Sequence, residues 1–175
     1  VEKGLSPKGT VPASVVAYTH DKGSRLIDVT DPSGMIHHSY DTMNRITQVT
    51  YPGSKSVGYE YDADSNRSKL TYPDNSFISY EYDQLNRLKT IKNQAGSAIA
   101  SYAYDALSRR TQVDLANNTQ SFYTYDAINR LTQLVNKITG GANISSFSYT
   151  FDKAGNRTSL RGGAAGADEA ILSLR

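Results

Sequence analysis

Apolar and polar residues alternate in short stretches on either side of a recurring aspartate. In the stretch around Asp83, aromatic residues stand at two-residue spacing before the aspartate, as Tyr80 and Tyr82, and Leu88 and Ile91 follow it among Lys and Thr. A two-residue period is typical of a strand with one face more apolar than the other. Two such stretches around a tight turn predict a β-hairpin.

This pattern repeats along the chain, and the central aspartate marks each copy. The seven copies are centred on Asp21, Asp41, Asp62, Asp83, Asp105, Asp126 and Asp152. The spacings are 20, 21, 21, 22, 21 and 26 residues. A repeat of this length is one supersecondary unit. We therefore predict an all-β chain of tandem β-hairpins, with roughly fourteen strands in a curved or spiralling antiparallel sheet.

Every copy has an aromatic ring one and three residues before the aspartate, and we number positions from that aspartate. Position −1 is His20, Tyr40, Tyr61, Tyr82, Tyr104, Tyr125 and Phe151, and position −3 is Tyr18, His38, Tyr59, Tyr80, Tyr102, Tyr123 and Tyr149. Rings at alternate positions lie on one face of a sheet, where they can stack across strands. Repetition predicts a ladder of aromatic rings along that face.

Position +3 predicts the turn. It holds Ser24, Asn44, Ser65, Asn86, Ser108, Asn129 and Gly155, which tolerate a left-handed backbone or bond it locally. An arginine follows at position +4 in five copies, as Arg25, Arg45, Arg87, Arg109 and Arg130. In two copies the arginine stands at +5, as Arg67 and Arg157, behind Asn66 and Asn156. Position +8 is aliphatic in every copy, so we expect the arginine to move by one place while the strand keeps its register.

Second turns, rich in Pro, Gly and Asn, follow about ten residues after each aspartate turn. They include 31–34, 51–53, 72–75, 93–96 and 117–118, and Gly140-Gly141 lengthens the last connection. We predict an irregular lead-in over residues 1–14, seven repeats over 15–161, and a Gly/Ala-rich linker with a C-terminal segment over 162–175. Residues 168–174 in that segment are compatible with a short helix or a strand.

A carboxylate beside tyrosines suggests acid–base catalysis, but catalytic carboxylates occur as a unique pair in a pocket and not once per repeat. We expect each aspartate to accept backbone N–H bonds in its turn, with the following arginine as a charged partner within or between hairpins. We predict no catalytic residue and no cofactor. The structural repeat residues are Tyr59, Tyr61, Asp62, Arg67, Tyr80, Tyr82, Asp83, Arg87, Tyr102, Tyr104, Asp105, Arg109, Tyr123, Tyr125, Asp126 and Arg130.

Composition supports a thin structure. Hydrophobic residues make up 38% of the chain, and the aromatic residues are 13 Tyr and 4 Phe without Trp. This hydrophobic share is below that of ordinary globular domains, as expected for an elongated or thin-walled sheet. The net charge of +2 is spread along the chain, which argues against nucleic-acid binding. Without cysteine there are no disulfides or thiolate metal sites.

The remaining sequence features concern membrane insertion, processing, metal binding and glycan binding. No apolar run is long enough to span a membrane and no signal segment is present. The sequence begins at Val1, so we expect a processed chain or a piece of a longer polypeptide. His37 and His38 are adjacent and would face opposite sides of a strand, so we predict no metal site. An exposed ladder of Tyr, Asp and Asn also suits sugars, and glycan binding stays open.

The copy has the form Y-x-Y-D-x-x-N-R-L, best seen in residues 80–88 and 123–131. This resembles the YD repeat of Rhs proteins, the C component of Tc toxins, and teneurins, over residues 18 to about 161. The resemblance implies a strip of hairpins that spirals into a hollow shell. In bacterial members such a shell encloses a variable C-terminal toxin, and in teneurins it belongs to an extracellular adhesion apparatus. YD repeats are also associated with carbohydrate binding. The self-cleaving core segment and toxin that often follow the repeats are not found in this sequence.

Three functions follow as hypotheses. The first is a non-catalytic segment of a YD shell, joined to further YD repeats, which encapsulates a toxin or effector. The second is an extracellular filament or surface protein that self-assembles through its sheet edges. The third is a secreted carbohydrate-binding or adhesion module. All three predict a secreted or cell-surface protein, with a bacterial origin implied by the resemblance.

Overall fold

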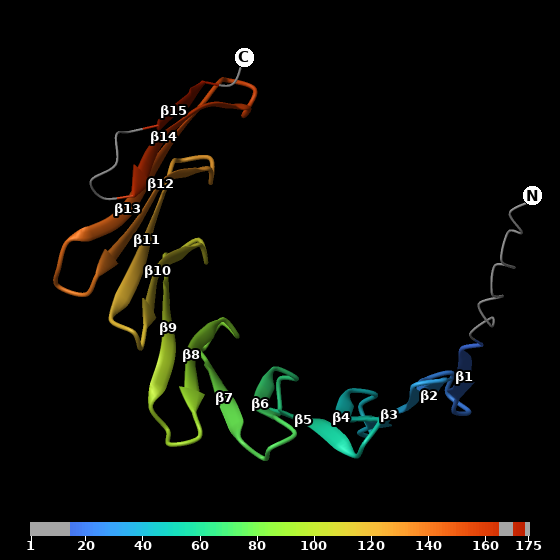
Figure 1. Cartoon of the computed structure of the whole chain (residues 1–175). Coiled ribbons are helices and arrows are strands. Elements are labelled where there is room, and N and C mark those ends of the chain that lie inside the picture. The colour runs from blue at the N-terminus through green and yellow to red at the C-terminus, as the bar shows by residue number, and fades with distance from the viewer. Residues whose placement is uncertain (1–14, 165–169, 174–175) are drawn as a thin grey trace, which may run out of the picture. The chain divides into compact units, whose positions relative to one another are not determined.

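The computed structural model describes residues 15–164 and 170–173, and it consists of β-strands joined by turns over those residues. The predicted lead-in, residues 1–14, lies outside the described residues. The strands are β1 (Ala17–His20), β2 (Leu26–Asp31), β3 (Gly34–Tyr40), β4 (Ile46–Tyr51), β5 (Lys55–Tyr61), β6 (Arg67–Thr71), β7 (Phe77–Tyr82), β8 (Leu88–Asn93), β9 (Ala98–Tyr104), β10 (Arg110–Leu115), β11 (Thr119–Tyr125), β12 (Leu131–Ile138), β13 (Asn143–Phe151), β14 (Arg157–Ala164) and β15 (Ala170–Ser173). The all-β fold of tandem antiparallel hairpins is confirmed (Figure 1).

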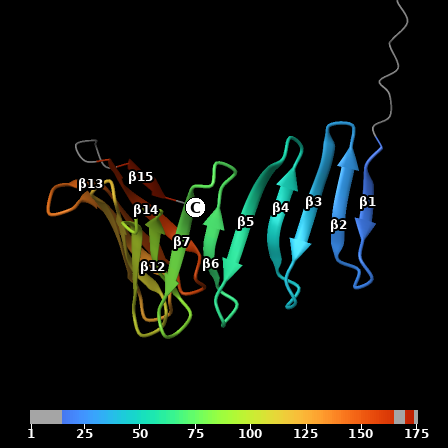
Figure 2. The same cartoon turned by 90° about the horizontal axis from the view of Figure 1, so that it is seen from below.

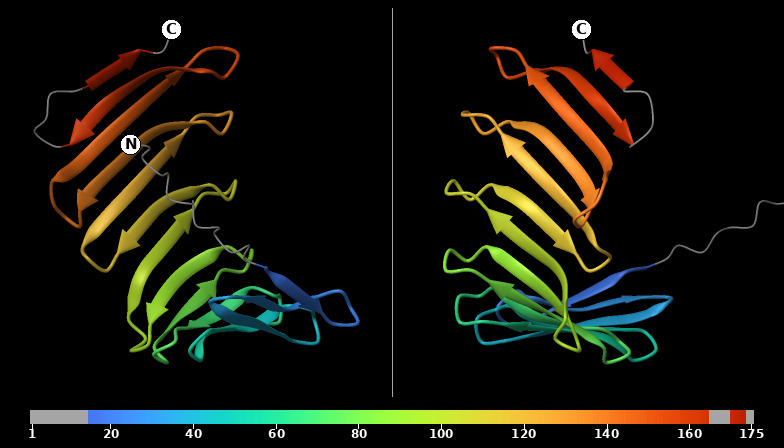
Figure 3. Two further views of the ribbon diagram at one scale, coloured as in Figure 1. Left: turned by 45° about the vertical axis from the view of Figure 1, so that its right-hand side comes forward. Right: turned by 90° about the vertical axis from the view of Figure 1, so that its left-hand side faces the viewer.

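The strands form two compact units, each an open antiparallel sheet. Unit 1 contains the described residues up to Glu60 together with Leu70–Asn75, and unit 2 contains Tyr61–Lys69 and the described residues from Ser76 onward. In unit 1 the strands β1 to β5 pair in chain order (Figure 2). In unit 2 the strands β7 to β15 do the same (Figure 3). The aspartate turns of each unit therefore lie along one side of its sheet, and the second turns lie along the other.

Six of the hairpins contain the same irregularity next to the aspartate turn. In β7 and β8 the partners are Tyr80 with Ile91, Glu81 with Thr90, and Tyr82 with Leu88, so the register shifts by one residue. An equivalent shift occurs between β1 and β2, β3 and β4, β9 and β10, β11 and β12, and β13 and β14. One extra residue on one strand is a β-bulge. Because of the bulge, positions +5 and +8 face the same side of the sheet although they are three residues apart.

The two faces of the sheet differ in chemistry. The face formed by positions −5, −3, −1, +5 and +8, which we call the aromatic face, carries Ile78, Tyr80, Tyr82, Leu88 and Ile91 in the hairpin of β7 and β8. The opposite face, which we call the polar face, carries positions −4, −2, +7 and +9. In the same hairpin these are Ser79, Glu81, Thr90 and Lys92. This separation follows from strand alternation and is what the sequence pattern predicts.

No second layer covers either face within the described part of the chain. There the buried apolar side chains are Val49, Ala100 and Val113, and the buried polar one is Thr90. The Tyr, Leu and Ile side chains of the aromatic face are mostly half-buried. Such a sheet depends on its hydrogen-bond ladder and on packing within one layer, because a two-layer core is missing from these residues.

The strand β14 continues to Ala164, so Gly162 and Gly163, which we assigned to a linker, belong to the sheet. Gly162 has a φ of 144°. A Cβ atom there would collide with the carbonyl oxygen of Ser146 and come within 2.8 Å of the Phe147 Cα. This glycine thus permits close approach of two strands, a role that a glycine-rich sequence does not distinguish from a flexible linker. Residues 170–173, for which the sequence allowed helix or strand, form β15 against β14.

Candidate functional site: a ladder of aspartate turns

The repeat aspartates initiate tight turns with one left-handed residue. In the turn between β7 and β8, the Asn86 N–H donates to the Asp83 carbonyl at 3.0 Å and the Asp83 N–H donates to the Arg87 carbonyl at 2.9 Å. Asn86 has a φ of 57°. Position +3 has a positive φ in every other copy too, at Ser24, Asn44, Ser65, Ser108, Asn129 and Gly155. The predicted left-handed position is confirmed.

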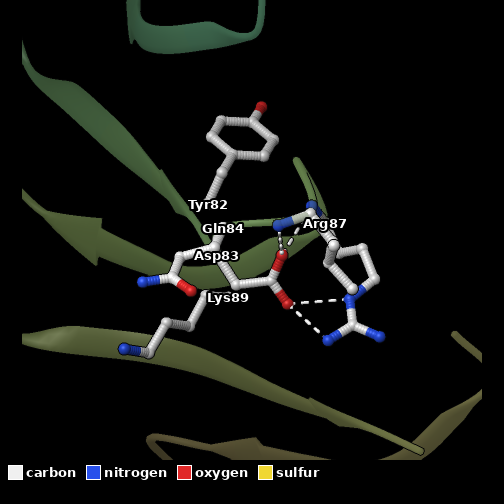
Figure 4. Close-up of a pocket in the computed structure, with 6 residues that line it drawn as sticks. Tyr82, Asp83, Gln84, Arg87 and Lys89 are labelled. Carbon is white, nitrogen blue, oxygen red and sulfur yellow. Dashed lines mark hydrogen bonds and ion pairs between the residues drawn. The ribbon is translucent and has the colours of Figure 1, made fainter. Parts of the chain in front are cut away.

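The aspartate side chain closes the turn from within (Figure 4). Asp83 Oδ1 accepts hydrogen bonds from the N–H groups of Leu85 at 2.9 Å and Arg87 at 3.1 Å. Its Oδ2 accepts from Arg87 Nε at 2.7 Å and lies 2.7 Å from the second guanidinium nitrogen. Hydrogen bonds from the Arg87 side chain, then from the two amides, hold the pKa of the Asp83 carboxyl below its usual value. This carboxylate is fully engaged inside its own turn.

The arginine at position +4 also reaches the next aspartate turn. Arg87 donates to the Asp105 carbonyl at 3.3 Å and to Ser108 Oγ at 3.1 Å, and its guanidinium lies 4.7 Å from the centre of the Tyr104 ring. Arg109 makes the same set of contacts one repeat later, with the Asp126 turn and the Tyr125 ring. Each arginine therefore joins two consecutive turns.

The same contacts recur in both units. In unit 1, Arg25 donates to Asn44 Oδ1 at 2.8 Å and lies 4.8 Å from the Tyr40 ring. In unit 2, Arg130 donates to the Asp152 carbonyl at 3.0 Å and lies 4.6 Å from the Phe151 ring. We call this chain of aspartate, arginine and the following turn the turn ladder.

Tyrosines at position −1 link the repeats in the opposite direction. The Tyr104 hydroxyl donates to the Leu88 carbonyl at 2.8 Å, and the Tyr125 hydroxyl donates to the Arg110 carbonyl at 2.9 Å. The hydroxyls of Tyr40 and Tyr82 bond the preceding hairpins likewise. Partial burial raises the pKa of Tyr104 above its ordinary value. Phe151 occupies this position in the last copy, and it keeps the arginine contact but has no hydroxyl.

Tyrosines at position −3 lie within the aromatic face. Tyr80, Tyr102 and Tyr123 stand directly opposite Ile91, Val113 and Leu134 on the paired strands. Tyr59 and Tyr61 are both half-buried residues of β5. The structure thus gives the two tyrosine positions different surroundings, with aliphatic partners at −3 and an arginine with a carbonyl at −1.

In the copy of Asp62 the arginine stands one position later, as Arg67. Asn66 takes the place of the arginine, since its N–H and its side-chain amide donate to the Asp62 carboxylate at 2.8 Å and 3.1 Å. The Asn66 amide also reaches the next turn, at Asn86 Oδ1. Arg67 stands at +5 and lies 5.8 Å from the Tyr80 ring, on the aromatic face where four other copies have Leu or Ile and two have arginine, Arg110 and Arg157. Asn156 makes the equivalent contacts with Asp152.

The described side chains do not converge on a metal site, since no group of three or more His, Asp or Glu is placed to hold an ion there. His37 Nδ1 lies 2.6 Å from Asp28 Oδ1, and Thr19 Oγ donates to the other oxygen of that carboxylate at 2.8 Å. His38 Nδ1 lies 3.4 Å from the Ile27 carbonyl. The two histidines thus have separate partners.

Position +2 of the repeat carries a feature that the sequence predictions missed. Aliphatic side chains at this position are among the most exposed of the described residues: Met43, Leu85, Leu107 and Ile128. The aspartate alignment contains this signal, because the turn interrupts the strand alternation and a large apolar residue there has no face of the sheet to occupy.

Comparison with solved structures shows the same fold in toxin complexes. A TcdB2–TccC3–TEV crystal structure is similar with a TM-score of 0.75 at 16% identity, and the match covers 91% of this chain and 10% of that one. A Tc holotoxin pore from Photorhabdus luminescens with a mutated TccC3 has a TM-score of 0.74 at 15% identity, over 90% of this chain and 9% of that one. The chain therefore spans about a tenth of these relatives.

Sequence comparisons narrow the family. No curated protein sequence shows significant similarity to the chain. In the described residues no helix is long and apolar enough to cross a membrane. The model of the teneurin YD-shell family matches residues 5–93. Since that match spans half of the 175 residues, the chain belongs to the teneurin YD-shell family.

Proposed function

We propose that the chain is a non-catalytic wall segment of a YD shell that encloses a toxin or effector polypeptide. The observation that carries this proposal is the one-layer sheet with two chemically different faces. A wall needs one face toward water and one toward its contents, and it must stay rigid without a core on either side. The turn ladder supplies that rigidity through contacts between consecutive repeats.

The aromatic face is the side that would meet the enclosed polypeptide. In the hairpin of β9 and β10 it carries Ala100, Tyr102, Tyr104 and Val113, together with Arg110, which lies over the Tyr123 ring, whereas the polar face presents Ala103 and Gln112. Apolar and aromatic surface gains most from removal of water. The polar face tolerates water without loss. We therefore orient the aromatic face inward.

The chemistry of the repeats agrees with a wall and not with catalysis. Each aspartate of the turn ladder is held by hydrogen bonds within its turn, as in Asp83. Catalytic carboxylates flank one substrate bond in a common pocket, whereas these carboxylates recur once per repeat and each is held by donors of its own turn.

A second function, self-assembly at the cell surface, is favoured by one strand edge. The strand β1 is four exposed residues long, and among the described strands it pairs with β2 alone. An open edge can pair with another chain by strand addition. Both functions place the protein outside the producing cell, which the similarity to Tc toxin components supports.

Photo-cross-linking from two neighbouring residues tests whether the aromatic face contacts an enclosed polypeptide. A photoreactive amino acid at Tyr102, on the aromatic face, should cross-link to the enclosed polypeptide in the complete protein. The matched control is the same amino acid at Ala103, on the polar face, which should not cross-link. Equal cross-linking from both positions, or cross-linking from Ala103 alone, would contradict an inward aromatic face. Growth of the particle mass with concentration beyond two copies, measured by light scattering, would instead support self-assembly.

A further inference from the structure

Three consecutive aspartate turns of unit 2 carry a large exposed aliphatic side chain at position +2. Leu85 is 66% exposed, and Leu107 and Ile128 are each 64% exposed. Their N–H groups donate to the carboxylates of their own turns at 2.9, 2.9 and 3.0 Å, so each side chain projects from a fixed point. The residues before them are uncharged: Gln84, Ala106 and Ala127. We call Leu85, Leu107 and Ile128 the turn row.

Four backbone N–H groups of the central turn already have partners within the turn, so a surface that covers them does not leave them unpaired. In the central turn, the Asp105 and Ser108 N–H groups donate to backbone carbonyls. The Leu107 and Arg109 N–H groups donate to Asp105 Oδ1. Covering a turn costs most when it leaves a polar group unpaired, and here these groups have internal partners. The charge of Arg109 is likewise compensated by Asp105.

The two ends of the turn row have opposite charge. On one side is the turn of Asp62, whose position +2 is the exposed Asp64. The hydrogen bond between Asn66 and Asn86 places that turn next to the turn of Leu85. On the other side is the turn of Asp152, with the exposed Lys153 at position +1. Along the sheet the order is thus acidic, three aliphatic, basic.

We propose that the turn row pairs with the turn row of a second copy of this chain, in antiparallel direction about a two-fold axis at Leu107. Leu107 then meets its own copy, Leu85 meets Ile128, and Asp64 meets Lys153 at both ends. A parallel pairing would oppose Asp64 to Asp64 and Lys153 to Lys153. The contact uses the aspartate-turn side of the sheet, so it is distinct from the aromatic face and from the strand edges.

An isologous contact of this kind closes at two copies, because each turn row is used up by its partner. The apolar surface consists of three side chains per copy, well below the roughly 1,200 Å² of a stable interface. The dimer is therefore weak and concentration-dependent. The ion pairs at its ends set the direction and contribute little affinity, since they are solvent-exposed.

Sedimentation velocity of the 175-residue chain over a wide range of concentration tests the contact. The expected result is a monomer–dimer equilibrium that stops at two copies. Leu107→Asp places two carboxylates at the two-fold axis and should weaken the dimer at least about tenfold. Ile138→Asp is the matched control, since Ile138 is 51% exposed on the side of the second turns. It should leave the dimer unchanged, and circular dichroism of both variants should match the parent.

Charge exchange tests the antiparallel direction. Asp64→Lys and Lys153→Asp should each weaken the dimer, because each variant opposes like charges at both ends. The double variant Asp64→Lys with Lys153→Asp should restore the parent affinity. A monomer at every concentration, mass growth beyond two copies, or a double variant no better than the single ones would overturn the proposal.

Discussion

Asp83 combines two tasks that the sequence suggests separately. Its Oδ1 accepts two backbone amides, and its Oδ2 holds the Arg87 guanidinium. Turn closure and the charged pair therefore depend on one carboxylate. The amide bonds were predictable, because aspartate at the start of a turn commonly accepts them. The arginine was predicted as a charged partner within or between hairpins, and Arg87 is both, since it also reaches the Asp105 turn.

The turn carboxylates predict how stability depends on pH. The pKa values of Asp21, Asp41, Asp83, Asp105, Asp126 and Asp152 are lowered in the folded state. A carboxyl group whose pKa is lowered on folding stabilises the folded state at pH values above its unfolded pKa of 3.8. This stabilisation is lost as the pH falls through the pKa of the folded state. The thermal midpoint should thus be steady between about pH 7 and 5 and fall steeply below about pH 4.

Measurement of the thermal midpoint across this pH range, at constant ionic strength, checks the carboxylate contribution. Replacement of several turn aspartates by asparagine is the control, and it should flatten the acidic limb. A midpoint that holds or rises below the unfolded aspartate pKa would contradict the role of the carboxylates.

We expect the turn ladder to be weaker at Asn66 than at the arginines of the other copies. Its amide makes one hydrogen bond to the Asp62 carboxylate, whereas Arg87 contacts the Asp83 carboxylate through two nitrogens. Asn66→Arg should therefore raise the free energy of unfolding by about 0.5 kcal/mol, measured by urea denaturation. Asn66→Lys, with a charge but no planar fork, should give less. A loss of stability with arginine would show that Asn66 is required for another reason.

At the scale of the element, the repeated unit is a hairpin with a bulge, and the sequence shows only part of it. Alternation predicted both strands and the two faces. The aliphatic residue at +8 indicated that the register is kept, but the bulge explains why Leu88 and Ile91 face the same side. The bulge also explains why Arg67, at position +5, lies on the aromatic face.

Two matched variants test how much the tyrosine hydroxyl at position −1 contributes to stability. Tyr104→Phe removes the hydroxyl that bonds the Leu88 carbonyl, and it should cost about 1 kcal/mol of unfolding free energy. Phe151→Tyr should do the reverse, because Arg130 already lies over the Phe151 ring as in the other copies. Its new hydroxyl would meet the Leu131 carbonyl of the preceding hairpin. Urea denaturation of both variants measures this, and a change of the same sign in both would contradict the prediction.

In the pairing of β13 with β14, we expect any side chain at Gly162 to destabilise the sheet. Gly162→Ala places a Cβ against the Ser146 carbonyl oxygen and adds backbone strain, so it should destabilise the sheet by about 2 kcal/mol or more. Gly96→Ala is the control. Gly96 also has a positive φ, of 80°, but nothing lies within 4 Å of its Cβ position, so this variant reports strain without the clash. Equal losses in the two variants would contradict the close approach.

At the scale of the whole molecule, the sequence predicted the number of hairpins and the open sheet. It did not predict the division into two compact units in the repeat of Asp62, because the repeat pattern continues through that point. Nor did it predict the turn row, since an exposed apolar residue in a turn carries no periodic signal. Both features depend on how repeats contact one another, and a single repeat does not contain that information.

The described strands bury few side chains, so they need another source of cohesion between hairpins. In the described residues the turn ladder meets this need: in the repeat of Asp105, Arg109 contacts the next aspartate turn and the Tyr104 hydroxyl bonds the repeat before. If the links hold neighbouring hairpins together, loss of one arginine must be felt in two turns.

Amide hydrogen exchange of Arg109→Ala tests this most directly, with the adjacent Arg110→Ala as the control. Arg109 contacts Asp105 in its own turn and the Asp126 carbonyl in the next, whereas Arg110 lies over the Tyr123 ring. The predicted result is faster exchange at Leu107 and also at Ile128, Asn129 and Arg130 in the Arg109 variant, with the turn of Asp126 still protected in the Arg110 variant. Faster exchange confined to the turn of Asp105, or equal loss of protection in both variants, would contradict a ladder that joins the repeats.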